Sequence, residues 1–109
     1  MASKNKWIGM ASVRPAQGKE PLGPGVTSAY VNVVALAESA EDFESAAREA
    51  LAQYGFVLVQ LDDVDLLVQR ARSFAVDPVL IKDAKQIPST TNFVFGSFHS
   101  YTEDPREPV

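Results

Sequence analysis

The stretch from residue 27 to residue 61 restricts the possible folds of this chain more than any other part of its sequence. Apolar and mixed positions alternate over residues 27–37, and this period of two predicts a strand. The period becomes that of a helix between Ser39 and Gly55, and a second apolar stretch, residues 56–61, follows at once. A strand, a helix and a strand in direct succession indicate an α+β arrangement, and the unit is long enough for a right-handed crossover.

The helix in this unit has start and stop signals as well as an apolar stripe. Ser39 is a good N-cap residue with the carboxylate of Asp42 three positions later, and Gly55 supplies a left-handed C-terminal stop. Glu44 and Arg48 form an i, i+4 pair in the favourable order. The stripe that faces the core consists of Phe43, Ala46, Ala47, Ala50, Leu51 and Tyr54.

Two further helices are predicted after residue 61. Asp62 or Asp63 is expected to cap a helical stretch that runs to about Phe74. Asp77 and Pro78 open a short second helix, because aspartate is a capping residue and proline is tolerated at the first helical position. The apolar stripe of the first of these helices consists of Val64, Leu67, Val68 and Ala71.

The two ends of the chain supply the remaining strands. Residues 6–13 predict a first strand, residues 14–26 form a loop rich in proline and glycine, and residues 93–101 predict a last strand. Residues 102–109 are expected to fray. The resulting order, ββαβαβ, predicts one α+β domain over residues 1–109. Its expected form is a two-layer sandwich, a four-stranded mixed sheet with helices on one face.

Three parts of this pattern resemble the opening of ferredoxin-like α+β domains: Ala29-Tyr-Val-Asn-Val-Val-Ala, the alanine- and glutamate-rich helix, and Tyr54-Gly55-Phe-Val-Leu-Val. The chain is similar in particular to small uncharacterised bacterial proteins built on that plan. The resemblance covers about residues 27–63 and implies a ferredoxin-like variant, in which an extra N-terminal strand departs from the simple βαββαβ order. Since this fold carries many unrelated functions, the resemblance implies no site residues.

The composition excludes several kinds of site. The 109 residues include no cysteine and one histidine. These counts exclude a disulfide scaffold, a thiolate zinc site, an iron–sulfur cluster and a cysteine nucleophile. No apolar run approaches the roughly 20 residues of a membrane span, so a cytoplasmic protein without membrane contact is expected.

Charge is distributed unevenly along the chain. Residues 1–37 hold four bases and one acid, and residues 38–109 hold six bases and thirteen acids, so the net charge of −4 combines +3 with −7. The acidic excess argues against a nucleic-acid partner. It is either a solvated face that maintains solubility or a surface for a basic partner.

Two short motifs lack the pattern that their chemistry requires. Gly18-Lys19 is not preceded by the first glycine of a phosphate-binding loop and is not followed by Ser or Thr. The cluster of Asp62, Asp63 and Asp65 lacks the glycine turn and distal glutamate of a calcium loop, and helix capping explains its carboxylates. No metal ion and no cofactor are therefore expected.

The last strand contains the only histidine and several aromatic residues. Alternation places His99 on the same side as Phe93, Phe95, Ser97 and Tyr101. A half-exposed sheet histidine is expected, and a general base is the alternative. The rings of Phe93, Phe95, Phe98 and Tyr101 lack the flanking positive charge of an RNA-stacking platform, so most of them are expected in the core.

Sheet edges offer a further means of binding. If the last strand or the strand that contains Trp7 is an edge, no proline or inward charge guards it, and it can pair with a second copy or with a partner's strand. An edge covered by the loop of residues 14–26 or by the tail is the alternative.

These exclusions favour a small non-catalytic protein-binding module. The most specific interpretation is an inhibitor or immunity-type protein with an acidic face. One alternative is a small-molecule-binding regulatory domain, with the 14–26 loop as a lid over Tyr30, Asn32 and His99; another is an enzyme subunit that uses His99 beside a carboxylate. No catalytic residue is assigned. The candidate binding residues are Tyr30, Asn32, Asp62, Asp63, Asp65, His99 and Tyr101.

Overall fold

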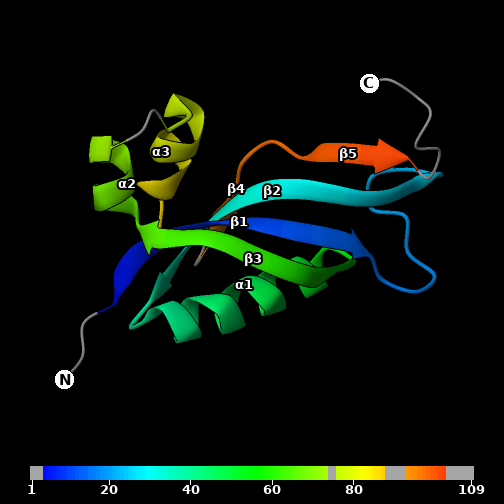
Figure 1. Ribbon diagram of the computed structural model, residues 1–109, viewed down its shortest axis with the longest axis horizontal. Coiled ribbons are helices and arrows are strands. Elements are labelled where there is room, and N and C mark those ends of the chain that lie inside the picture. The colour runs from blue at the N-terminus through cyan, green and yellow to red at the C-terminus, as the bar shows by residue number, and fades with distance from the viewer. Residues whose placement is uncertain (1–3, 74–75, 88–92, 103–109) are drawn as a thin grey trace.

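The structure, a computed structural model, describes residues 4–73, 76–87 and 93–102 (Figure 1). In chain order its elements are β1 (Asn5–Pro15), β2 (Val26–Ala37), α1 (Ala40–Gln53), β3 (Phe56–Leu66), α2 (Leu67–Ser73), α3 (Pro78–Ala84), β4 (Phe93–Phe95) and β5 (His99–Thr102). The protein is α+β, as predicted. Thr102, the first residue of the predicted tail, ends β5, and the rest of that tail lies outside the described residues.

The strands form one five-stranded sheet in the order β3-β1-β2-β4, and β5 also pairs with β2, so the prediction of four strands is wrong. Every described pair is antiparallel, so the prediction of a mixed sheet is wrong. Strands β2 and β3 do run in the same direction, but β1 occupies the position between them because it is already joined to β2 in a hairpin (Figure 1). Among the described strands, the strand of Trp7 is therefore central, and β3 is an edge. The ββαβαβ order of a ferredoxin-like variant is not matched, since the described chain ends in two strands instead of one.

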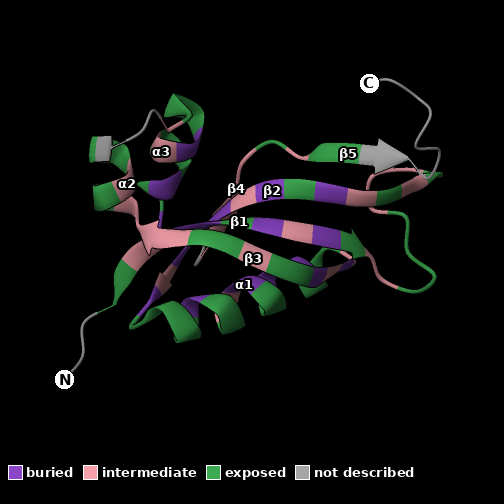
Figure 2. Cartoon of the chain, viewed as in Figure 1, coloured by how far each residue is buried: buried purple, intermediate pink, exposed green. Residues whose placement is uncertain are grey.

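Helix α1 covers one face of the sheet, and the main core lies between them (Figure 2). The predicted helix signals are confirmed: Ser39 Oγ accepts a hydrogen bond from the Asp42 N–H at 3.2 Å, and Gly55 has a φ of 86°. Phe43 is fully buried under β1, and its ring approaches the sheet at Gly9, which has no side chain. The alternating residues of β2 that face α1 are Ala29, Val31, Val33 and Ala35, also as predicted.

A second, smaller core lies on the opposite face at one end of the sheet. Its buried members are Ile8, Val34, Leu80, Ala84 and Ile87. Helix α3 begins as predicted, with Asp77 Oδ1 accepting a hydrogen bond from the Val79 N–H at 2.9 Å. Helices therefore lie on both faces, and the prediction of helices on one face is wrong. The physical reason is that apolar side chains of β1 and β2 also point away from α1 and need a second cover.

Strand β3 continues through Leu66, where a helix was predicted. Asp62 and Asp65 pair with residues of β1, so the prediction that Asp62 or Asp63 caps a helix is wrong. Asp63 has a φ of 54°, in the left-handed region that aspartate tolerates, and its carbonyl accepts a hydrogen bond from the Arg70 guanidinium of α2. Backbone pairing with β1, which is distant in the sequence, outweighed the local signals for a helix start at Asp62 and Asp63.

The last strand, predicted over residues 93–101, is divided into β4 and β5. Phe95 of β4 pairs with Val33 of β2, whereas His99 of β5 pairs with Tyr30. Three steps along β2 thus correspond to four steps along the final segment. The extra residue exchanges the two faces of the strand, as a bulge does. The prediction that His99 shares a face with Phe95 is therefore wrong.

Candidate functional site

The sheet brings three of the candidate residues together on the face opposite α1. Tyr30 pairs with His99 of β5 on one side and with Ser12 of β1 on the other. Asn32 lies two residues farther along β2 on the same face and pairs with Met10. Tyr30 is 42% exposed, and His99 is exposed as well. These five residues form the open sheet face.

The three aspartates that follow in β3 do not form a common site. Asp62 pairs with Met10 and so borders the open sheet face, and its two carboxylate oxygens accept hydrogen bonds from Gln60 Nε2 at 2.9 and 3.1 Å. The carboxylate of Asp65 lies 4.0 Å from Arg70 Nε, and Asp63 is exposed at the left-handed position. Within residues 4–73, 76–87 and 93–102, no group of three or more histidine or carboxylate side chains is arranged to hold a metal ion.

Two features that would support the alternative functions are not among the described ion pairs and hollows. His99 forms no described ion pair with a carboxylate, whereas an enzyme of the kind considered needs that pairing in a cleft. The described hollows have lining residues other than Tyr30, Asn32 and His99. Tyr101 lies in β5 opposite Ser28 of β2.

Five aromatic rings gather on the α1 side of the sheet, at its β4–β5 edge. They belong to Tyr54, Phe56, Phe93, Phe95 and Phe98. Phe56 and Phe98 stack with their centroids 5.0 Å apart, and Tyr54 meets Phe95 edge-on at 5.5 Å. Phe93, Phe95 and Phe98 also pack against the main core. Because these rings contact one another and the core, the open sheet face does not present them as a stacking platform for bases.

Helix α1 has an acidic outer surface that the sequence-based candidates omitted. Residues 38–55 contain five acids and one base, a net charge of −4 that equals the net charge of the whole chain. All five carboxylates are exposed, and among the described residues only Glu44 forms an ion pair, with Arg48 at 3.5 Å. The acidic helix surface consists of Glu38, Glu41, Asp42, Glu44 and Glu49. The polar positions opposite the apolar stripe were the signal that could have identified it.

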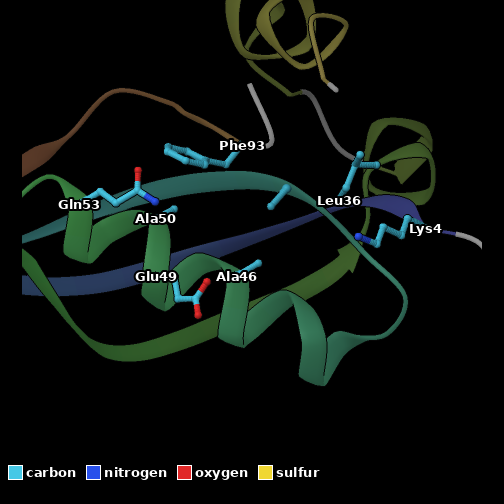
Figure 3. Close-up of a pocket in the computed structure, with 8 residues that line it drawn as sticks. Lys4, Leu36, Ala46, Glu49, Ala50, Gln53 and Phe93 are labelled. Atoms are coloured by element: carbon cyan, nitrogen blue, oxygen red, sulfur yellow. The ribbon is translucent and has the colours of Figure 1, made fainter. Parts of the chain in front are cut away.

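A groove runs along one side of α1, between the helix and the β2–β4 part of the sheet (Figure 3). Its middle is a hollow of about 330 Å³, where Ala46 and Ala50 of α1 face Phe93 of β4 and the polar groups of Glu49 and Gln53 form the rim. The alanines leave this space open because their side chains end at Cβ.

Two more hollows extend the groove toward both ends of the helix. One of about 380 Å³ shares Ala46 and Glu49 with the middle hollow and reaches Glu38 beside the start of α1. Another, of about 400 Å³, shares Gln53 and reaches Gly55 after the end of α1. We refer to the three hollows together as the helix groove.

The loop between β1 and β2, residues 16–25 in the structure instead of the predicted 14–26, closes the groove beside the end of α1. The Ala16 N–H donates a hydrogen bond to the Gly55 carbonyl at 2.8 Å, and Leu22 packs against the main core. Lys19 and Pro21 line the third hollow. These contacts place the loop on the α1 side of the sheet, opposite Tyr30 and Asn32, where it does not serve as their lid.

Comparisons with known proteins give no family assignment. The chain matches no protein-family model, and no curated protein and no solved structure shows significant similarity to it. In the described residues, no helix has the length and apolar character needed to cross a membrane.

Proposed function

We propose that this protein is a non-catalytic binding module whose acidic helix surface engages a basic protein partner, as an inhibitor or immunity-type protein does. The observation that carries this proposal is the concentration of net charge −4 on residues 38–55. Four of these five carboxylates have no ion-pair partner among the described residues, so their field is directed at solvent. Such a field accelerates encounter with a positive surface and selects against negative ones.

The helix that carries these charges is docked firmly on the sheet. Its inner side is anchored by Phe43, Ala47, Ala50 and Leu51, which are all buried. Because the backbone of α1 is fixed against the sheet, the Cα atoms that carry the carboxylates keep a constant spacing, and a partner has to order only their side chains on binding.

A capture experiment with two variants of equal charge tests the proposal. The tagged protein is used to retain a partner from a lysate of its host at an ionic strength of about 0.05 M and again at about 0.5 M, where the Debye length falls from roughly 14 to roughly 4 Å. The variant Glu41→Lys/Glu49→Lys reverses two charges on α1, and Asp62→Lys/Asp83→Lys reverses two exposed charges elsewhere.

The purified partner is then titrated against all three proteins. We expect salt to release it and the α1 variant to weaken binding at least about tenfold, whereas the control variant binds nearly as the wild type does. Binding that ignores salt, or that is lost only in the control variant, would contradict the proposal. A gene neighbour that encodes a toxin would support the immunity-type interpretation, and a location inside a metabolic operon would count against it.

A second copy of this chain is the other candidate partner, through the outer edge of β3. No described strand pairs with that edge. Val59, at a register shift of β3, is 61% exposed, and one edge carbonyl, that of Leu58, is contacted by Arg48 Nη1 at 3.5 Å. Two β3 strands related by a twofold axis would pair antiparallel and extend the sheet.

A further inference from the structure

The helix groove has a shape suited to a chain segment of a partner. It follows α1, whose 14 residues correspond to a length of about 21 Å. An extended peptide advances about 3.3 Å per residue, so roughly six residues match that length. At the middle of the groove, the alanine floor meets the ring of Phe93.

The middle hollow is suited to an apolar side chain. Ala35, Ala46 and Ala50 form its floor, and its volume of about 330 Å³ exceeds that of any one side chain. Phe93 is held in place from behind by Tyr54, whose ring meets it edge-on with a centroid separation of 6.0 Å. An aliphatic side chain inserted here would be removed from water against the alanine methyls and the ring.

Charge decides which kind of segment fits. Glu38, Asp42 and Glu49 are the acids that line the middle hollow and the hollow beside the start of α1. Among the described lining residues of these two hollows, Lys4 is the one base. We infer that the helix groove binds an extended segment of the basic partner, with lysine or arginine along the carboxylates and an aliphatic side chain in the middle hollow. This inference rests on the proposed function and adds to it the place and the chemistry of the contact.

The charge of Lys4 distinguishes binding in the helix groove from binding to a general acidic surface. Lys4 lines the middle hollow and the hollow beside the start of α1. No ion pair between Lys4 and a carboxylate is described. Its ammonium group therefore repels a basic segment inside the groove without being neutralised there. Removing that charge with Lys4→Ala should tighten binding, although it makes the protein more acidic by only one charge.

Residues on the two sides of α1 provide matched variants. At 100° per residue, Ala46 and Glu49 lie on the groove side, whereas Ala40 and Glu41 do not. Ala46→Leu fills the middle hollow without a change in charge, and Ala40→Leu makes the same substitution away from it. Glu49→Lys and Glu41→Lys reverse one charge each, inside and outside the groove.

The probe is a synthetic peptide of six residues with a central leucine flanked by lysines, titrated into the full chain at low salt and followed by NMR amide shifts. We expect shifts along the groove side of α1 and at Phe93. Ala46→Leu should weaken binding about tenfold and Ala40→Leu less than twofold, and Glu49→Lys should weaken it more than Glu41→Lys. Lys4→Ala should strengthen it about twofold.

The outcomes separate the two proposals. Shifts confined to the Glu41–Glu44 side, or equal losses in Ala46→Leu and Ala40→Leu, would overturn the groove and leave the acidic helix surface as the contact. A partner that is captured without dependence on any α1 charge would overturn both. A peptide in which alanine replaces the leucine should bind more weakly, and equal binding would overturn the role of the middle hollow.

Discussion

Substitution of Gly9 tests how closely α1 is docked on the sheet, and therefore where the helix groove lies. A Cβ atom at Gly9 would stand 2.9 Å from Phe43 Cε2, 3.2 Å from Leu61 Cδ1 and 3.3 Å from Val64 Cγ2. All three distances are shorter than the optimum of about 3.5–4.0 Å between carbon atoms. The fully buried Phe43 ring cannot yield toward solvent, so the methyl group of Gly9→Ala must displace the helix or the strand.

The expected free-energy change combines two opposing effects. Overpacking costs about 1–3 kcal/mol, and the smaller conformational freedom of the unfolded chain returns about 0.4–1 kcal/mol when alanine replaces glycine. We therefore expect Gly9→Ala to lower the free energy of unfolding by about 1–2 kcal/mol. Gly96→Ala is the matched control, because its Cβ would meet Asn32 Cβ at 3.6 Å, which is ordinary van der Waals contact.

Urea unfolding, followed by the fluorescence of Trp7, the one tryptophan in the chain, measures both variants. Gly9→Ala should lower the midpoint without changing the slope, whereas Gly96→Ala should leave it unchanged or raise it. In the Gly9→Ala background, Phe43→Leu should cost less than it does in the wild type, because the smaller side chain leaves room for the methyl group. If Gly9→Ala is as stable as Gly96→Ala, or if the two substitutions at Gly9 and Phe43 are additive, the close approach of α1 to β1 is wrong.

Three further predictions concern single positions. Ser39→Ala removes the acceptor for the Asp42 N–H and should lower the free energy of unfolding by about 1 kcal/mol in the same urea assay. Asp63→Val should be less stable than Asp63→Gly by about 1–2 kcal/mol, since valine resists a φ of 54°, and equal midpoints would show that this backbone is not left-handed. If the protein sediments as a dimer through β3, Val59→Lys should sediment as a monomer and Val79→Lys, at 63% exposure on α3, should not; the same behaviour in both variants would exclude the β3 edge.

The two surfaces described above lie on opposite sides of the sheet and can be tested separately. The open sheet face gathers Tyr30, Asn32 and His99 by strand register, but no described hollow is lined by them. The acidic helix surface and the helix groove lie together on α1 and share Glu38, Asp42 and Glu49. Convergence of charge and shape on one element is the reason to place the contact there.

The sequence by itself determined the elements whose causes are local. The start and stop of α1 at Ser39 and Gly55 depend on capping and on left-handed backbone within one turn, and both are confirmed. The alternation of β2 and the opening of α3 at Asp77 follow from the same kind of short-range signal. The acidity of α1 was also present in the sequence, as the polar side of a helix whose apolar stripe was recognised.

Only the tertiary structure decided the features that depend on distant partners. Pairing with β1 turned Asp62 from an expected helix cap into a strand residue, and one extra residue before β5 placed His99 opposite Tyr30, on the face away from Phe95. Strand order, the second cover on the opposite face and the helix groove likewise arise from contacts between separate elements. A period of two or 3.6 reports which side chains share a face, but it carries no information about which partner lies against that face, and that choice minimises the free energy of the whole chain.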